Sequence, residues 1–152
     1  MSTTKFACSV IISQRQQVVF DFTQEYNHRL TWDSFLKKAV LINGATSAGK
    51  GVKAYCVAKN GIGMVTEYVT YNRPQVTAIK MTKGPYMFQS FLGSWTFKQL
   101  PGEKTEVIFL YSFSLRFPFK LFTTVIKNNL QANVQQRLAD LKKHMENTAQ
   151  PV

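Results

Sequence analysis

Apolar positions in the last third of the chain recur at three- and four-residue spacing, which is the period of an α-helix. Most positions between them are polar from Pro118 onward. Pro118 suits the first turn of a helix, because its φ angle is already helical and it has no backbone N–H to leave unpaired. The pattern predicts one long terminal helix with an apolar face about 30 Å long, formed by Phe122, Ile126, Leu130, Val134, Leu138, Leu141 and Met145.

The rest of the chain is dominated by segments rich in Val, Ile and aromatic residues or by strict alternation of apolar and polar residues, both typical of β-strands. Turn sequences separate these segments: NGIG at 60–63, NRP at 72–74, KGP at 83–85 and LPGEK at 100–104. Asn-Gly favours a two-residue hairpin turn, because both residues tolerate positive φ angles. Such short connections imply antiparallel order. The predicted strands are 5–13, 38–42, 52–59, 64–71, 75–82, 88–98 and 105–115.

The segment GATSAGKG at 44–51 partly matches the phosphate-binding motif GxxxxGK[ST]. Gly44, Gly49 and Lys50 fit, but Gly51 stands where a Ser or Thr hydroxyl would bind magnesium. A phosphate loop also leads into a helix whose first amide groups hold the anion, whereas a β-pattern follows Lys50. We therefore interpret the segment as a hairpin connection in which Gly and Ser supply the turn geometry.

Two short helices are predicted between the first and second strands. Ser13 is a candidate N-cap for the first helix, and the second covers residues 27–36. Their helically spaced apolar residues are Val18, Val19 and Phe22 in the first and Leu30, Trp32 and Phe35 in the second. One strand, two short helices, six strands and a long helix predict an α+β fold, with the helix against one face of a seven-stranded antiparallel sheet. We expect a single domain over residues 1–152.

Alternation assigns the two faces of this sheet. The outer, solvated face should carry Lys53, Lys59, Glu67, Lys80, Lys98 and Glu106. The inner face should carry Val52, Ala54, Cys56, Met64, Thr66, Tyr68, Ile79, Met81, Phe91, Trp95, Phe97, Phe109, Tyr111 and Phe113. Side chains of this size facing a curved sheet either fill the space beneath it or line a hollow.

The net charge of +11, from 19 Lys and Arg against 8 Asp and Glu, favours anionic partners. The cations are dispersed, with Lys37–Lys38 and Lys142–Lys143 as the only adjacent pairs, and no nucleic-acid-binding motif accompanies them, which argues against nucleic acid as a partner. A weak contact with an anionic membrane surface remains open. No apolar run approaches the roughly 20 residues of a membrane span, and no secretory signal pattern is present. We expect a cytoplasmic monomer or homodimer.

Few residues suit catalysis. His28 lies in a polar context and His144 beside Lys143, so both are expected at the surface, whereas a general base must reach into a pocket. For Asp33, a helix-surface or capping role is favoured over proton transfer at a cavity mouth. Cys8 and Cys56 are interpreted as buried free thiols. We predict no catalytic residue, no metal site and no cofactor.

Several stretches resemble a known family: QQVVFDF and WDSF near the start, GPYMFQSFLGSWTFKQLPGEKTEVIFLYSF in the middle, and RLADLKKHMEN near the end. They are similar to the polyketide cyclase/dehydrase and lipid-transport family of the START-like (SRPBCC) superfamily, which includes the major birch pollen allergen, and also to coenzyme-Q-binding START proteins. The resemblance implies a helix-grip fold, in which the sheet wraps the terminal helix and leaves an apolar cavity. It does not imply a single activity, because relatives include carriers, receptors and enzymes.

An enclosed apolar space with a few orienting polar groups is sufficient for a binding site. We therefore predict binding or transport of a hydrophobic small molecule, such as a lipid, a quinone or a polyketide-like compound. The alternative is a polyketide cyclase, aromatase or dehydratase acting in the same cavity, and whether the protein is an enzyme is left open. The predicted ligand-binding residues are Trp32, Phe35, Cys56, Thr66, Tyr68, Met81, Phe91, Trp95, Phe97, Phe109, Tyr111, Phe113, Ile126, Asn129, Leu130 and Asn133. The glycines at 44, 49, 51, 61 and 63 are predicted to form a movable rim.

Overall fold

The computed structural model describes residues 3–148 and contains the predicted sheet. Its strands are antiparallel neighbours in the order β1-β7-β6-β5-β4-β3-β2, so β1 and β2 form the two edges. The first and last strands of the chain therefore lie side by side, with Phe6 opposite Tyr111 and Cys8 opposite Phe109. The strands are β1 (Thr4–Ile12), β2 (Leu36–Leu41), β3 (Lys53–Ala58), β4 (Gly63–Asn72), β5 (Val76–Lys83), β6 (Phe88–Leu100) and β7 (Lys104–Leu115).

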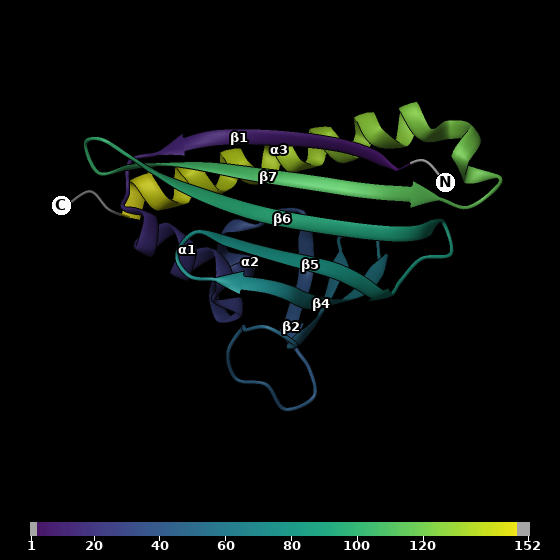
Figure 1. Cartoon of the computed structure of the whole chain (residues 1–152), viewed down its shortest axis with the longest axis horizontal. Coiled ribbons are helices and arrows are strands. Elements are labelled where there is room, and N and C mark those ends of the chain that lie inside the picture. The colour runs from purple at the N-terminus through teal and green to yellow at the C-terminus, as the bar shows by residue number, and fades with distance from the viewer. Residues whose placement is uncertain (1–2, 149–152) are drawn as a thin grey trace.

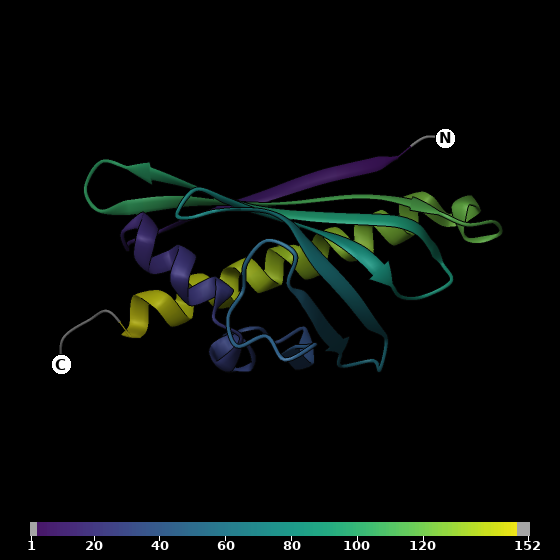
Figure 2. The ribbon, with the colours of Figure 1, turned by 60° about the horizontal axis from the view of Figure 1, so that its bottom comes forward.

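The long terminal helix is present as α3 (Thr123–Thr148), preceded by the 3-10 turn η2 (Phe119–Phe122). Helices α1 (Gln16–Gln24) and α2 (Arg29–Trp32), with the 3-10 turn η1 (Tyr26–His28) between them, follow β1. Figures 1 and 2 show the sheet curving over α3, with α1 and α2 near the C-terminal end of α3 and η2 at the opposite end. The predicted helix-grip architecture is confirmed. No helix within residues 3–148 is long and apolar enough to cross a membrane.

The apolar face of α3 packs against the sheet along its C-terminal half. Val134, Leu138, Leu141 and Met145 are buried in one core cluster with aromatic residues of β6 and β7. Toward its N-terminus the same face is less covered, because Ile126 and Leu130 are only partly buried. The helix therefore meets the sheet closely at one end and leaves space at the other.

Several helix boundaries differ from the sequence predictions. Arg15, not Ser13, is at the N-cap of α1, because the chain first turns through a Gln14 N–H to Ile12 carbonyl bond. The second helical segment ends at Trp32, and the predicted remainder of the segment gives way to β2, which begins at Leu36.

The turns that precede α3 and β4 also differ from the sequence predictions. Pro118 is at the N-cap of η2 rather than in the first turn of the α-helix, and Phe122 is exposed on η2 instead of continuing the apolar face. The tighter 3-10 winding shifts the direction of each side chain. In the Asn-Gly turn, Ala58 N–H donates to the Ile62 carbonyl, which leaves three residues in the loop instead of two.

The segment 44–51 joins antiparallel strands β2 and β3, as interpreted from the sequence. Gly44 and Gly51 have φ angles of 77° and 85°, which side chains with a Cβ rarely adopt. The element that directly follows Lys50 is strand β3, not a helix, so the arrangement of a phosphate-binding loop is not formed here.

Candidate ligand-binding cavity

A cavity of about 430 Å³ lies between the sheet, α2 and the face of α3 that is less covered. Aromatic side chains of β6 and β7 form much of its inner wall. Trp95 and Phe109 are directly opposite across these strands, and their ring centroids lie 4.2 Å apart. The predicted ligand-binding residues that line the cavity are Phe35, Cys56, Thr66, Tyr68, Phe91, Trp95, Phe109, Tyr111, Ile126, Asn129, Leu130 and Asn133.

Four predicted residues are not in the cavity wall: Trp32, Met81, Phe97 and Phe113. Phe97 is covered by α1 and packs against Phe20, with ring centroids 5.2 Å apart. Phe113 packs edge-on against Phe88 within the core, and Trp32 packs edge-on against Trp95. Met81 is only partly buried, beside the same core. Alternation correctly identifies a face of the sheet, but it does not indicate how far along each strand the cavity extends.

A buried ionic cluster that was not predicted from the sequence lies at the inner end of the cavity. Arg29, Asp33 and Arg137 are each almost fully buried. Arg29 Nε donates to Asp33 Oδ2 at 3.0 Å, and Arg137 Nη2 donates to the same oxygen at 2.9 Å. Arg137 Nε also donates to Asp33 Oδ1 at 3.0 Å, so that its contact with the carboxylate is bidentate. Asp33 thus joins α2 to α3, which corrects the helix-surface interpretation.

Both arginines line the cavity, whereas Asp33 lies behind them. Arg137 also donates from Nη1 to the Tyr111 hydroxyl at 2.8 Å, and its guanidinium lies over the rings of Phe35 and Phe109. In the sequence, Arg137 falls three residues after Val134 and four before Leu141, within the predicted apolar face. A charged residue at such a position indicates a buried and paired charge, although it does not identify the partner.

Burial alone would raise the pKa of the Asp33 carboxyl, but the guanidiniums of Arg137 and Arg29 outweigh it and hold the pKa below its usual range. Asp33 is therefore ionised at neutral pH. It accepts hydrogen bonds from both arginines and is poorly suited to act as a proton donor.

A separate chain of hydrogen bonds begins beside this cluster at Tyr26, whose ring centroid lies 5.6 Å from the Arg29 guanidinium. The hydroxyls of Tyr26 and Tyr68 lie 3.1 Å apart, and Tyr68 donates to Gln24 Oε1 at 2.6 Å. Because Tyr68 uses its proton there, Tyr26 is the donor in the tyrosine pair. Burial raises the pKa of both phenols, that of Tyr68 more strongly, so both stay protonated at neutral pH.

The opposite end of the cavity opens to solvent between the β3–β4 turn and α3. Asn60 and Ile62 on the turn, and Val125 and Asn129 on α3, line the cavity and are exposed. Gly61 and Gly63 therefore belong to a segment that borders the opening, as predicted for the rim. The segment 44–51 contributes no residue to the cavity wall, so the glycines at 44, 49 and 51 are not at this opening.

Neither histidine lines the cavity; both stack on the ring of Phe22. Cys8 and Cys56 are free thiols that are partly buried, not fully buried as expected. Cys56 faces the cavity, and burial raises the pKa of its thiol, which keeps it in the less reactive protonated form. Residues 3–148 contain no group of three or more His, Cys, Asp or Glu arranged to hold a metal ion.

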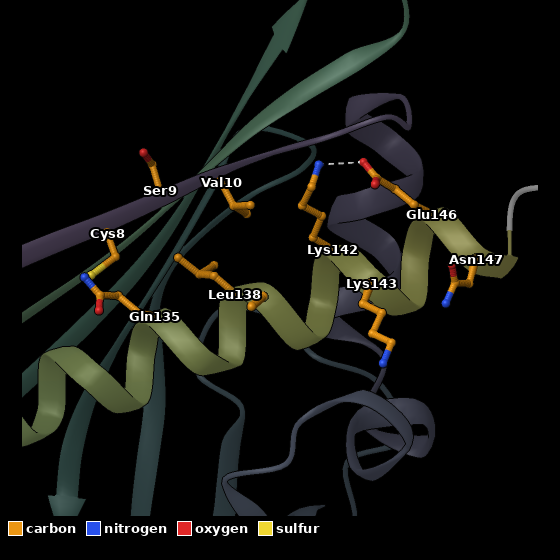
Figure 3. A pocket seen from close by; sticks show the side chains of 10 residues that line it. Cys8, Ser9, Val10, Gln135, Leu138, Lys142, Lys143, Glu146 and Asn147 are labelled. Atoms are coloured by element: carbon orange, nitrogen blue, oxygen red, sulfur yellow. Dashed lines mark hydrogen bonds and ion pairs between the residues drawn. The ribbon is translucent and has the colours of Figure 1, made fainter.

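A second hollow lies between β1 and the C-terminal half of α3 (Figure 3). Lys142 Nζ donates to the Ile11 carbonyl at 2.6 Å and pairs with Glu146 at 2.8 Å. Glu146 in turn accepts from the Ser13 backbone N–H. These bonds attach the edge strand to the helix, and we assign this hollow a structural role.

Comparison with known proteins supports the fold. The family model described as polyketide cyclase/dehydrase and lipid transport matches residues 3–146. A search of curated protein sequences finds no match.

Similar solved structures include the ZhuI aromatase/cyclase from Streptomyces sp. R1128, with TM-score 0.81, 13% identity, and coverage of 98% of this chain and 97% of that one. A protein of Thermus thermophilus gives TM-score 0.81 and 15% identity, covering 97% and 100%. Ginseng major latex-like protein 151 from Panax ginseng gives 0.72 and 15%, covering 94% and 97%. At these identities the likeness concerns the fold alone.

Proposed function

The chain belongs to the polyketide cyclase/dehydrase and lipid transport family, and on this premise we propose that it binds a hydrophobic small molecule in the cavity between the sheet and α3. The observation that carries the proposal is a space of about 430 Å³ with aromatic walls and one open end. Its size falls within the range of small-molecule sites, which are typically apolar with a few placed polar groups. A lipid, a quinone or a polyketide-like compound has the required character.

Removal of apolar surface from water supplies the driving force. A ligand that buries the area of one aromatic side chain, about 150–250 Å², gains about 4–6 kcal/mol at about 25 cal/mol per Å². Part of this gain offsets the entropy lost on association. Thr66 and the amide of Asn133 line the same space and are available to orient a polar group of the ligand.

Filling the cavity provides a direct test. Asn133 lines the cavity from α3, whereas Asn128 lies exposed on the same helix outside it. We expect Asn133→Trp to abolish the thermal stabilisation that apolar compounds give the wild-type protein, and the matched control Asn128→Trp to retain it. Native mass spectrometry should detect co-purified ligand in the wild type and the control only. Loss of binding in both variants, or in neither, would contradict the location of the site.

Cyclase, aromatase or dehydratase chemistry on a polyketide-like chain is the alternative function. The hydrogen-bonded Tyr26–Tyr68 pair at the cavity wall favours it, since a protonated phenol that exchanges its present acceptor for a substrate oxygen can polarise a carbonyl group. This alternative predicts turnover of a poly-β-ketone substrate that Tyr26→Phe and Tyr68→Phe reduce without a matching loss of binding. Unchanged turnover in both variants would exclude these phenols from the reaction.

A further inference from the structure

The two arginines of the cavity wall and the carboxylate behind them together carry one more positive than negative charge. Arg29 and Arg137 both line the cavity and are almost fully buried. Asp33 is the one carboxylate bonded to them among the described residues, and the wall itself includes no Asp or Glu. One guanidinium charge is therefore without a balancing anion in a region of low dielectric constant.

The two arginines differ in the hydrogen-bonding capacity they have left. Arg137 donates from Nε and Nη2 to Asp33 and from Nη1 to Tyr111. Arg29 donates from Nε to Asp33 and only weakly from Nη1, at 3.4 Å, to the Thr23 carbonyl. Its Nη2 has no hydrogen-bond partner within residues 3–148. Arg29 is thus the arginine with more donors available to a ligand.

The guanidinium of Arg29 is also held in a fixed position. It lies 5.6 Å from the ring centroid of Tyr26 and 5.2 Å from that of Trp32, while Asp33 fixes its Nε end. A buried charge without a partner is costly, and a hydrogen-bonded counter-ion removes much of that cost. A single surplus charge calls for a monoanion, and the planar fork of a guanidinium matches a carboxylate.

We propose that the ligand is an amphipathic carboxylate whose acid group pairs with Arg29 at the inner end of the cavity. Its hydrocarbon part extends past Trp95 and Phe109 toward the opening at Ile62 and Val125. This inference rests on the proposed function and specifies the chemical class of ligand.

Calorimetric titration with dodecanoate and with 1-dodecanol, below their micelle-forming or solubility limits, tests it. The two compounds share a chain length and differ in charge. We expect dodecanoate to bind the wild type at least about tenfold more tightly, as a charge-assisted hydrogen bond contributes. Arg29→Gln should remove this preference and leave dodecanol binding nearly unchanged. Arg73→Gln, at an exposed arginine outside the cavity, should retain the preference.

Equal affinities for the two compounds in the wild type would overturn the carboxylate inference while leaving the proposed function intact. Binding of neither compound would count against both. The difference between the affinities of the wild type for dodecanoate and dodecanol tests the inference even if Arg29→Gln does not fold.

A second inference rests on a different feature, an exposed apolar patch at the N-terminal end of α3. Phe117, Phe119, Leu121, Phe122 and Val125, which we call the tip patch, are each between 37% and 68% exposed. Five large apolar side chains within nine residues exceed the scattered exposure usual on a protein surface. The patch adjoins the cavity opening, because Val125 belongs to both.

The charges around the tip patch indicate what covers it. Arg116, Lys120 and Lys127 lie within and beside it, and the sequence contains no Asp or Glu between Glu106 and Asp140. A second copy of the chain docking patch to patch would bring like charges together, whereas an anionic lipid surface is complementary to them. We propose that the tip patch inserts into the interface of an anionic membrane, with the cavity opening beside the bilayer.

Co-sedimentation with phosphatidylcholine vesicles, with and without phosphatidylserine, tests this proposal. We expect binding that requires phosphatidylserine and that falls at least about tenfold in Leu121→Ser/Phe122→Ser, because each buried side chain contributes to partitioning. Leu30→Ser, at an exposed leucine on α2, should bind like the wild type.

Absence of binding to phosphatidylserine vesicles would overturn the docking proposal, as would equal binding by the double variant. A wild-type dimer that the double variant converts to monomers would overturn it in favour of self-association. The two substitutions leave the cavity intact, so the double variant should still bind dodecanoate. This titration therefore distinguishes loss of membrane docking from loss of the cavity site.

Discussion

Replacing Asp33 with Asn provides the sharpest test of the buried ionic cluster. The substitution preserves the size of the side chain and removes the negative charge that both Arg29 and Arg137 contact. Two guanidiniums then share a buried site without a counter-ion. Breaking a buried ion pair in this way costs about 3–5 kcal/mol, a large part of the roughly 5–15 kcal/mol that stabilises a typical domain.

Urea unfolding at neutral pH measures this loss directly. Tryptophan fluorescence is a suitable probe, because Trp32 and Trp95 pack against each other beside the cluster. For a chain of this length, about 2–4 °C per kcal/mol converts the expected loss into a fall of about 6–20 °C in Tm. Asp21→Asn is the matched control, since Asp21 forms an exposed ion pair with Arg73 and should affect stability far less.

A triple variant distinguishes two possible causes of the stability loss, the uncompensated charge and the loss of packing. Arg29→Met/Asp33→Leu/Arg137→Met replaces the cluster with apolar side chains of similar size, and we expect it to be much more stable than Asp33→Asn. Equal stability losses in Asp33→Asn and Asp21→Asn would refute the account of the cluster. A triple variant as unstable as Asp33→Asn would refute the assignment of the loss to uncompensated charge.

Acid and cavity substitutions give two further tests. The native pKa of Asp33 lies below its unfolded value of about 3.9. The stabilisation that ionised Asp33 provides is therefore complete above that pH and is lost as the pH falls through the native pKa. In urea unfolding, the free energies of unfolding of the wild type and Asp33→Asn should therefore converge in acid. A difference between them that does not change with pH would contradict this. Trp95→Ala should cost about 3–5 kcal/mol in urea unfolding and admit bulkier ligands, since Trp95 is buried in the cavity wall. Leu92→Ala, at an exposed position of the same strand, should do neither, and equal losses would argue against the assigned wall.

Local patterns were sufficient to predict the sheet and the helix, because alternation and three- and four-residue spacing report which face of an element is buried. They were insufficient for helix ends such as Ser13 and Phe122, where the chain's turns into α1 and α3 decide the boundary. The resemblance to a known family, rather than any periodicity, supplied the expectation of a hollow.

The ionic cluster was not predicted because it depends on contacts distant in sequence. Asp33 and Arg137 are separated by 104 residues, and no local rule brings a particular carboxylate to a particular guanidinium. Asp33 alone has the appearance of a helix-capping residue. The extent of the cavity was not predicted for a similar reason, since Phe97 and Phe113 share the inner face with Trp95 but pack against Phe20 and Phe88 instead of lining the cavity.

A crystal structure of the protein purified without added ligand would show whether the cavity between the sheet and α3 holds a small molecule. We expect continuous density for a non-protein molecule between α3 and the aromatic wall at Trp95 and Tyr111, reaching toward Arg29. Direct packing of α3 against that wall, with Asn133 and Leu130 in contact with Trp95 and no space between them, would contradict it.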